Sequence, residues 1–220
     1  MKSISKELIS TVIKKRKSAT HKGNYGRLLL IGGSKKYGGA LIMAAEGALN
    51  SGAGLVTVAT DRVNIAALHT RDPEIMTLNW DESIELKNLI KNSDVVVCGM
   101  GLGLDDKAQQ ILRLVRDNIT LKQTLILDAS ALDLIGQQTD LLPLNSKILI
   151  FTPHQMEWER LSGIKISDQS DELNQVALDK LVKNKNAILV LKSNHTKVYD
   201  QAGHIYCLLY TSDAADEGLG

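Results

Sequence analysis

The sequence alternates short apolar runs, which predict β-strands, with stretches that have the spacing of amphipathic helices. The first such unit consists of an apolar run at 28–31, a helical pattern at 40–49 and a second apolar run at 55–59. A strand–helix–strand unit is normally a right-handed crossover between parallel strands. Because the alternation continues to residue 191, it predicts an α/β protein whose mainly parallel sheet has helices on both faces.

The same patterns predict the boundaries of the elements. We expect strands at 28–31, 55–59, 74–78, 94–98, 124–127, 147–151 and 187–191, and a short hairpin at 196–199 and 204–206. We expect helices at 5–16, 40–49, 61–70, 82–91, 106–116, 130–134, 155–161 and 171–182.

Bulk composition is that of one globular domain. The chain has 220 residues, of which 44% are hydrophobic, so it is long enough for one sizeable core. The formal net charge of +1 gives no electrostatic reason to expect a nucleic acid or a membrane as a partner. Two cysteines form neither a disulfide framework nor a metal-ligand pattern, and no apolar run approaches the ~18 residues of a membrane helix. We therefore expect a cytoplasmic protein.

Several predicted strands end in glycine or in polar residues. Ligands of open α/β sheets bind beyond the carboxyl ends of the strands, and glycine lets a ligand approach the backbone. We therefore expect these strand ends to surround one cleft. The residues concerned are Gly33, Gly103, Asp128, His154 and Lys192.

Each strand end also has a simpler interpretation. His154 and Glu157 start a predicted helix, where they either face one ligand or cap the helix. The segment 192–196 either cradles phosphate or is a polar hairpin turn, and Asp128 either works near Mg²⁺ or caps the next helix. The glycines at 99–103 match neither the dinucleotide fingerprint nor a phosphate loop, and a tight turn explains them as well.

Taken together, these segments resemble the ADP-dependent NAD(P)H-hydrate dehydratases, members of the ribokinase-like superfamily. They fall in the order of that family and cover the chain from about residue 5 to residue 206. The matching segments are His21-Lys-Gly-Asn-Tyr-Gly-Arg-Leu-Leu-Leu-Ile-Gly-Gly-Ser, Tyr37-Gly-Gly-Ala, Ala44-Ala-Glu-Gly-Ala-Leu-Asn-Ser-Gly-Ala-Gly-Leu-Val-Thr, Gly99-Met-Gly-Leu-Gly, Thr152-Pro-His-x-x-Glu, and Leu191-Lys192 with Thr196.

The resemblance implies a ribokinase-like fold and a cofactor-repair reaction. ADP would phosphorylate the hydroxyl of the hydrated nicotinamide ring of NADHX or NADPHX, and loss of phosphate would regenerate NADH or NADPH and release AMP. This chemistry implies Mg²⁺, which neutralises developing phosphate charge. The resemblance also implies small-molecule partners and a homo-oligomer at full length.

The resemblance further assigns residues to roles. Ala40, Gly103 and His154 would contact the hydrated dinucleotide, and Glu157 would organise metal-bound water. The adenine nucleotide would be held by Lys192, Ser193, Asn194, His195 and Thr196.

Three features depart from the family pattern. The chain has Asp128-Ala-Ser130 where the family usually has Asp-Ala-Asp, and Lys192-Ser193 where it usually has Lys-Gly. The family's Gly-Ser-Gly-Asp motif, with the aspartate taken as general base, is expected beyond Tyr206 and does not occur in the 220 residues. No general base is therefore assigned within this chain.

The last residues have a different character. The stretch from Cys207 to Gly220 resembles the translation of a sequencing-library adaptor, so we expect a ribokinase-like domain at 1–206, incomplete at its C-terminus, and a non-native tail at 207–220. Two alternatives remain open: another ribokinase-like small-molecule kinase, for instance one acting on a thiamin-precursor alcohol, and an inactive fragment that only binds nucleotide or hydrated cofactor.

Overall fold

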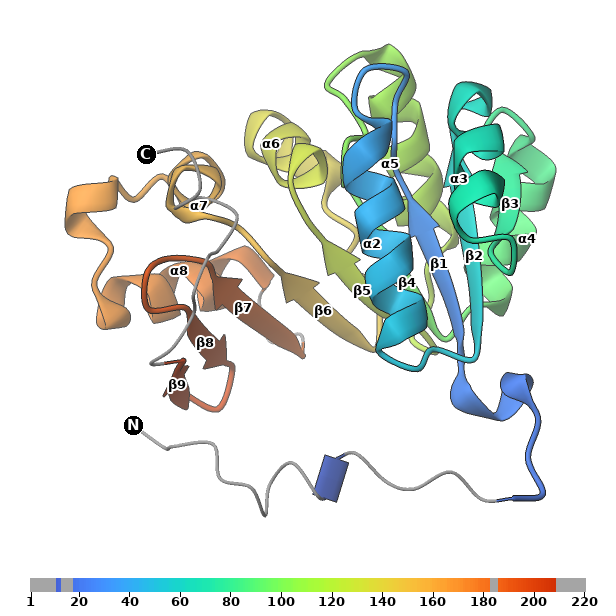
Figure 1. Cartoon of the computed structure of the whole chain (residues 1–220). Coiled ribbons are helices and arrows are strands. Elements are labelled where there is room, and N and C mark those ends of the chain that lie inside the picture. The colour runs from blue at the N-terminus through green and yellow to red at the C-terminus, as the bar shows by residue number, and fades with distance from the viewer. Residues whose placement is uncertain (1–10, 13–17, 183–185, 209–220) are drawn as a thin grey trace, which may run out of the picture.

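The chain folds around one mixed sheet (Figure 1). The computed structural model describes residues 11–12, 18–182 and 186–208. Among these residues, nine strands form the sheet in the order β3-β2-β1-β4-β5-β6-β7-β8-β9. Neighbours from β3 to β7 pair in parallel, whereas β8 and β9 are antiparallel additions at one edge.

The strands are β1 (Arg27–Ile31), β2 (Leu55–Thr60), β3 (Met76–Asn79), β4 (Val95–Cys98), β5 (Thr124–Leu127), β6 (Ile148–Phe151), β7 (Ala187–Leu191), β8 (Lys197–Asp200) and β9 (Ile205–Cys207). The α-helices are α2 (Gly38–Asn50), α3 (Ile65–Arg71), α4 (Ser83–Asn92), α5 (Asp106–Asn118), α6 (Ser130–Gln137), α7 (Gln155–Ser162) and α8 (Asp171–Val182). Four 3₁₀ turns are η1 (Lys22–Tyr25), η2 (Arg62–Asn64), η3 (Thr139–Leu141) and η4 (Ile166–Asp168).

Helices cover both faces of the sheet, as predicted. Successive side chains of a strand point to opposite faces. In β1, Leu30 packs with residues of α2 and α3, whereas Leu29 and Ile31 belong to the larger core that α4 to α8 complete on the other face. Figure 1 shows α2 and α3 in front of β1 and β2. Both faces of the central strand are therefore buried.

The predicted alternation of strands and helices is confirmed, with differences at some boundaries. The helix expected at 61–70 is split into η2 and α3, because the Asp61 carboxylate accepts a hydrogen bond from the Val63 amide and starts a separate 3₁₀ turn. The strand expected at 74–78 is shifted and becomes β3. Only two residues of the helix expected at 5–16 are described, and both are helical.

The order of the strands reverses next to β1. From β1 the chain moves outward through β2 to β3, and it then returns to place β4 on the other side of β1. The connections after β1 and after β4 therefore lead in opposite directions. Such a reversal leaves a crevice beyond the carboxyl ends of the two strands, and ligands of open α/β sheets bind there.

The described part of the tail continues the hairpin. Cys207 is the last residue of β9, opposite Lys197, and the Leu208 amide donates to the Thr196 carbonyl oxygen at 2.9 Å. The rest of the predicted non-native tail, 209–220, lies outside the described residues. No helix in the described ranges has the length and apolar character that crossing a lipid bilayer requires.

Candidate functional site

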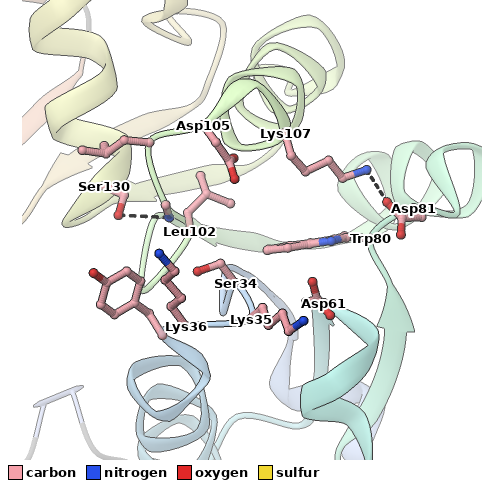
Figure 2. A pocket seen from close by; sticks show the side chains of 13 residues that line it. Ser34, Lys35, Lys36, Asp61, Trp80, Asp81, Leu102, Asp105, Lys107 and Ser130 are labelled. Carbon is pink, nitrogen blue, oxygen red and sulfur yellow. Dashed lines mark hydrogen bonds and ion pairs between the residues drawn. The ribbon is translucent and has the colours of Figure 1, made fainter.

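A pocket of about 670 Å³ opens at the carboxyl edge of the sheet (Figure 2). Its lining comes from the segments that follow five adjacent strands, β1 to β5. These residues are Ser34, Lys35, Lys36 and Tyr37 after β1, Asp61 after β2, Trp80 and Asp81 after β3, Leu102, Gly103, Leu104, Asp105 and Lys107 after β4, and Ser130 after β5. The pocket therefore occupies the reversal point of the sheet.

Close packing of two loops forms the floor of this pocket. The Ser34 amide donates to the Gly101 carbonyl oxygen at 2.6 Å, which ties the loop after β1 to the loop after β4. A Cβ at Gly101 would lie 2.1 Å from the Tyr37 carbonyl oxygen, and the φ of Gly101 is +60°. Glycine is therefore required at 101 both for the contact and for the backbone conformation. The tight-turn interpretation of 99–103 is correct, and the turn also lines the pocket.

Gly103 and Ser130 meet at one end of the pocket. The Gly103 amide donates to the Ser130 Oγ at 3.3 Å, so the loop after β4 is joined to the start of α6. Ser130 stands where the family pattern usually has aspartate. A hydroxyl therefore lines the pocket at this point, and the only negative charge of the Asp128-Ala-Ser130 segment is that of Asp128.

Asp128 joins three neighbouring strand ends. Its Oδ1 accepts from the Lys192 Nζ at 2.9 Å and from the Thr152 Oγ1 at 2.8 Å, so β5, β6 and β7 are linked beyond their carboxyl ends. Its side chain does not cap α6, because the N-cap of that helix is Ala129 and lacks a side-chain cap. The capping interpretation of Asp128 is therefore wrong. The carboxylate instead forms an ion pair with the Lys192 ammonium beyond the carboxyl ends of the strands.

Ala129 has an unfavourable backbone conformation between Asp128 and Ser130. Its φ is 47° and its ψ is −121°, a region that residues with a Cβ rarely adopt. Gly99 packs directly against this turn, since a Cβ at Gly99 would lie 1.8 Å from the Asp128 carbonyl oxygen. The strained turn therefore fixes where Asp128 and Ser130 point.

His154 and Glu157 form a reciprocal cap at the start of α7. The His154 Nδ1 accepts from the Glu157 amide at 3.1 Å, and the Glu157 Oε2 accepts from the His154 amide at 2.8 Å. The capping interpretation is therefore correct. The imidazole is still accessible, because the side chain of His154 is 52% exposed, whereas that of Glu157 is 8% exposed.

The segment 192–196 forms the connection between β7 and β8. Lys192 pairs with His154 through an isolated parallel bridge, which brings the predicted nucleotide segment beside the predicted substrate-binding histidine. Ser193 Oγ donates to the His195 carbonyl oxygen at 3.0 Å, and Thr196 Oγ1 donates to the Ser193 carbonyl oxygen at 3.2 Å. The segment therefore forms a polar hairpin turn with Asn194 and His195 exposed at its tip, and its role in holding phosphate stays a prediction.

A polar network holds this hairpin against α7 and α8. Asp171 Oδ1 accepts from the Lys197 Nζ at 2.7 Å and from the Tyr199 hydroxyl at 2.8 Å. Tyr199 in turn accepts from the Asn174 Nδ2 at 3.3 Å, and the Asn174 Oδ1 accepts from the Trp158 Nε1 at 2.8 Å. The network is inside the core, because Asn174, Trp158 and Tyr199 are all buried.

The predicted site residues lie along one edge of the sheet. Gly33, Gly103, Asp128, His154 and Lys192 follow β1, β4, β5, β6 and β7, which are consecutive neighbours with parallel direction. Gly103 lines the pocket, and the other four lie along the same edge outside its lining. Ala40 lies in the first turn of α2, three residues beyond Tyr37 of the pocket wall.

Sequence reasoning did not identify several residues of the pocket as functional, among them Lys35, Lys36, Trp80 and Asp81. The only feature of the sequence that could have identified them is that they follow predicted strands. The strand expected at 74–78 is shifted to Met76–Asn79 in the structure, so Trp80 and Asp81 did not directly follow its predicted end.

Among the described residues, no group of three or more His, Cys, Asp or Glu side chains is arranged to hold a metal ion. Cys98, at the end of β4, is fully buried, and burial raises the pKa of its thiol to about 12. The thiol therefore stays neutral near neutral pH, as is usual for a buried structural cysteine. Asp128, after β5, and Glu157, after β6, supply carboxylate oxygens of the kind that ligate metal ions.

Comparison with known proteins identifies the family. The family model described as NAD(P)H-hydrate dehydratase matches residues 28–218. An ADP-dependent (S)-NAD(P)H-hydrate dehydratase from Lactiplantibacillus plantarum is 47% identical over 90% of this chain and 69% of its own length.

Solved structures agree with this match. A ribokinase-like superfamily protein from Enterococcus faecalis has a TM-score of 0.86 and 43% identity, over 93% of this chain and 70% of the other. An ADP/ATP-dependent NAD(P)H-hydrate dehydratase from Bacillus subtilis, with 24% identity and a TM-score of 0.79 over 97% of this chain and 74% of its own, shows the same fold. The fold is thus ribokinase-like, and this chain belongs to the NAD(P)H-hydrate dehydratase family.

Proposed function

We propose that this protein acts in the ADP-dependent dehydration of hydrated NADH and NADPH. The hydroxyl of the hydrated ring takes the β-phosphoryl group of ADP, AMP leaves, and the phosphate ester then eliminates phosphate to restore the reduced nicotinamide. The relative from Lactiplantibacillus plantarum carries this activity in its name. The observation that carries the proposal is the pocket at the reversal of the strand order, with Gly103 in its wall and the Lys192–Asp128 pair farther along the same edge.

The proposal assigns the hydrated dinucleotide to Ala40, Gly103 and His154. Parallel strands lie about 4.8 Å apart, so the ends of β4 and β6 are separated by about 10 Å. A dinucleotide is long enough to contact residues at both. The exposed imidazole of His154 orients the substrate. Glu157 holds this ring in place, because its amide donates to Nδ1 in the helix cap and its carboxylate lies 3.5 Å from Nε2.

The proposal assigns ADP to the segment 192–196. This segment contributes the ammonium of Lys192, the hydroxyls of Ser193 and Thr196 and the amides of the turn at the carboxyl edge of β7. Cations, hydroxyls and turn amides are the groups that bind phosphate oxygens. The departure from Lys-Gly to Lys192-Ser193 adds a hydroxyl that reaches the His195 carbonyl oxygen inside the turn.

The donors at this edge fit a magnesium ion that is held mainly by phosphate and water. Mg²⁺ usually keeps several waters and takes one or two carboxylates together with substrate phosphates. Asp128 and Glu157 are two carboxylates at neighbouring strand ends, and Glu157 is nearly buried and committed to the helix cap. Glu157 would therefore act on the ion through water. Bound Mg²⁺ would neutralise charge on the transferring phosphoryl group.

The proposal places the reaction in the cytoplasm. Neither described cysteine is in a disulfide, which suits a reducing compartment. The partners are NADHX or NADPHX and ADP. Assembly of the full-length protein into a homo-oligomer remains a prediction from the family.

Measuring three products together tests this function. NADHX is incubated with ADP and Mg²⁺, and the absorbance of the reduced ring, AMP and inorganic phosphate are followed, with ATP in place of ADP as a parallel reaction. The assay is run on the 220-residue chain and on a version continued to a Gly-Ser-Gly-Asp motif. We expect equal amounts of NADH, AMP and phosphate from the longer version.

A small-molecule kinase would give a different result. It would consume nucleotide with a hydroxylated substrate and leave a stable phosphate ester, without restoring the reduced ring. If neither version restores NADH from NADHX in the presence of ADP, the proposed function is wrong.

A further inference from the structure

Two lysines of the pocket wall have cationic groups that the protein itself does not use. Lys35 and Lys36 form the turn between β1 and α2, and neither ammonium makes a hydrogen bond or ion pair with another described residue. In contrast, the third lysine of the pocket, Lys107, forms an ion pair with Asp81 (Figure 2).

The carboxylates of the pocket are already committed. Asp81 is paired with Lys107, and Asp61 and Asp105 cap η2 and α5 by accepting from the amides of Val63 and Ala108. Formal charges cancel over the three lysines and three aspartates of the lining. Backbone amides engage the carboxylates of Asp61 and Asp105, whereas the ammonium groups of the two lysines after β1 have no hydrogen-bond or ion-pair partner among the described residues.

The two lysines point to different parts of the pocket. Figure 2 shows the Lys35 ammonium directed toward Asp61, and the Lys36 ammonium directed toward Leu102 and the end of the pocket where Ser130 lies. Lys36 therefore lines the same pocket as Gly103, a predicted substrate contact, and lies two residues before α2, whose first turn contains Ala40.

We propose that Lys36 binds the pyrophosphate of the hydrated dinucleotide and so sets its position in the pocket. The inference rests on the proposed function and adds a binding residue to it. A pyrophosphate carries about two negative charges, and an ammonium binds phosphate oxygens through charge-assisted hydrogen bonds. A volume of about 670 Å³ lies within the range of small-molecule and cofactor pockets.

The choice of the pyrophosphate over the 2′-phosphate follows from the position of Lys36. With the reactive ring toward the edge formed by Asp128 and Lys192, the nicotinamide ribose lies near Gly103, and the pyrophosphate comes next along the ligand. The adenosine then extends toward Trp80 and Asp81, away from the direction in which the Lys36 ammonium points. Lys36 should therefore act equally on NADHX and NADPHX.

Binding measurements on the 220-residue chain test this inference without requiring turnover. Isothermal titration gives the Kd of NADHX, of NADPHX and of hydrated dihydronicotinamide riboside, which has no phosphate. We expect Lys36→Gln to weaken NADHX and NADPHX alike by about tenfold, as for the loss of one charge-assisted hydrogen bond. The affinity for the riboside should not change.

Two further variants make the result specific. Lys36→Arg keeps the charge and should retain most of the affinity for both dinucleotides. Lys87→Gln removes an exposed lysine on α4 and serves as the charge-matched control, for which we expect no change.

Each remaining outcome overturns the inference in a distinct way. Equal affinities of Lys36→Gln and the unmodified chain would show that Lys36 does not contact the ligand, although the proposed function would stand. A loss confined to NADPHX would assign Lys36 to the 2′-phosphate, and an equal loss for the riboside would show an effect that does not involve phosphate. If the unmodified chain binds none of the three ligands, the inference is wrong, whereas the proposed function is decided separately by NADH recovery with the longer version.

Discussion

The backbone conformation of Ala129 orients two neighbouring side chains of the candidate site. Its positive φ directs Asp128 toward Lys192 on one side and Ser130 toward Gly103 on the other. A residue with a Cβ in such a conformation costs of order 1–3 kcal/mol, which the surrounding structure must offset. The strain is therefore located between two side chains of the candidate site.

We predict that Ala129→Gly stabilises the protein. Glycine removes the strain at φ 47° but loses more conformational entropy on folding, so the free energy of unfolding should rise by about 1 kcal/mol. Urea unfolding measures this change. Ala66→Gly is the matched control, because Ala66 lies in the helix α3, where glycine should cost about 1 kcal/mol. A loss of stability in Ala129→Gly would show that the turn is not strained.

His154 has two separable roles in our interpretation, a helix cap and a substrate contact. His154→Ala removes both, whereas His154→Asn keeps a side chain that caps helices well and removes the imidazole. We predict that only His154→Ala lowers the free energy of unfolding, by about 1 kcal/mol. Both variants should bind NADHX more weakly by calorimetry. Unchanged NADHX affinity in His154→Asn would mean that the residue is only a cap.

At the scale of elements, the hairpin of β8 and β9 depends on the network around Asp171. Partial burial would raise the pKa of Asp171, but hydrogen bonds from Lys197 and Tyr199 outweigh it and lower the pKa below its usual value. Burial raises the pKa of Tyr199, so its hydroxyl stays protonated and donates to this carboxylate. The network therefore requires an ionised Asp171.

This network predicts a loss of stability in acid. Because the pKa of Asp171 is lower in the folded state, its contribution is present above the unfolded pKa of about 3.9 and is lost as the pH falls through the folded value. Urea unfolding between about pH 5 and pH 3 should therefore show a smaller decline for Asp171→Asn than for the unmodified chain. The neighbouring Glu172→Gln is the control. Equal declines for Asp171→Asn and the unmodified chain would contradict the assignment.

The elements themselves could be predicted well from the sequence because they depend on local patterns. Apolar runs and helical spacing located β5, β7 and α8 at their observed bounds. The split of the helix expected at 61–70 was not predicted, since it depends on whether the Asp61 cap starts a 3₁₀ turn or an α-helix.

The candidate site could be predicted only in part. The rule that ligands bind at strand ends identified Gly103 and Lys192. Both lie at the same edge of the sheet because they follow parallel strands. The pairing of Lys192 with Asp128 joins residues 64 positions apart, and the orientation of Lys36 depends on the packing of two loops. Such contacts are set by tertiary structure, and no local pattern encodes them.

At the scale of the whole molecule, binding and catalysis should be separable. The proposed substrate contacts and the nucleotide segment all precede Tyr206, whereas the family resemblance assigns the general base to a motif that does not occur in the 220 residues. Losing a positioned general base typically lowers the rate by about 10² to 10⁴-fold. We therefore predict measurable NADHX affinity but little turnover for this chain.

This prediction is checked by steady-state rates of NADH recovery. The rates are measured for the 220-residue chain and for the version continued to the Gly-Ser-Gly-Asp motif. Calorimetry with NADHX on the shorter chain is run in parallel. Comparable rates from the two would place the catalytic groups within residues 1–206.

The reversal of the strand order also has a consequence for the growing polypeptide. β1 acquires its neighbour β2 soon after synthesis, but its second neighbour, β4, is complete only after the 38 residues from Asp61 to Cys98 have been added. At about 5–20 residues per second this interval lasts about 2 to 8 s. During it, the apolar segment Leu28–Ile31 has an unpaired backbone edge to which another nascent chain can add. The strand that leads into the ligand crevice therefore keeps one backbone edge open to aggregation while the chain is being synthesised.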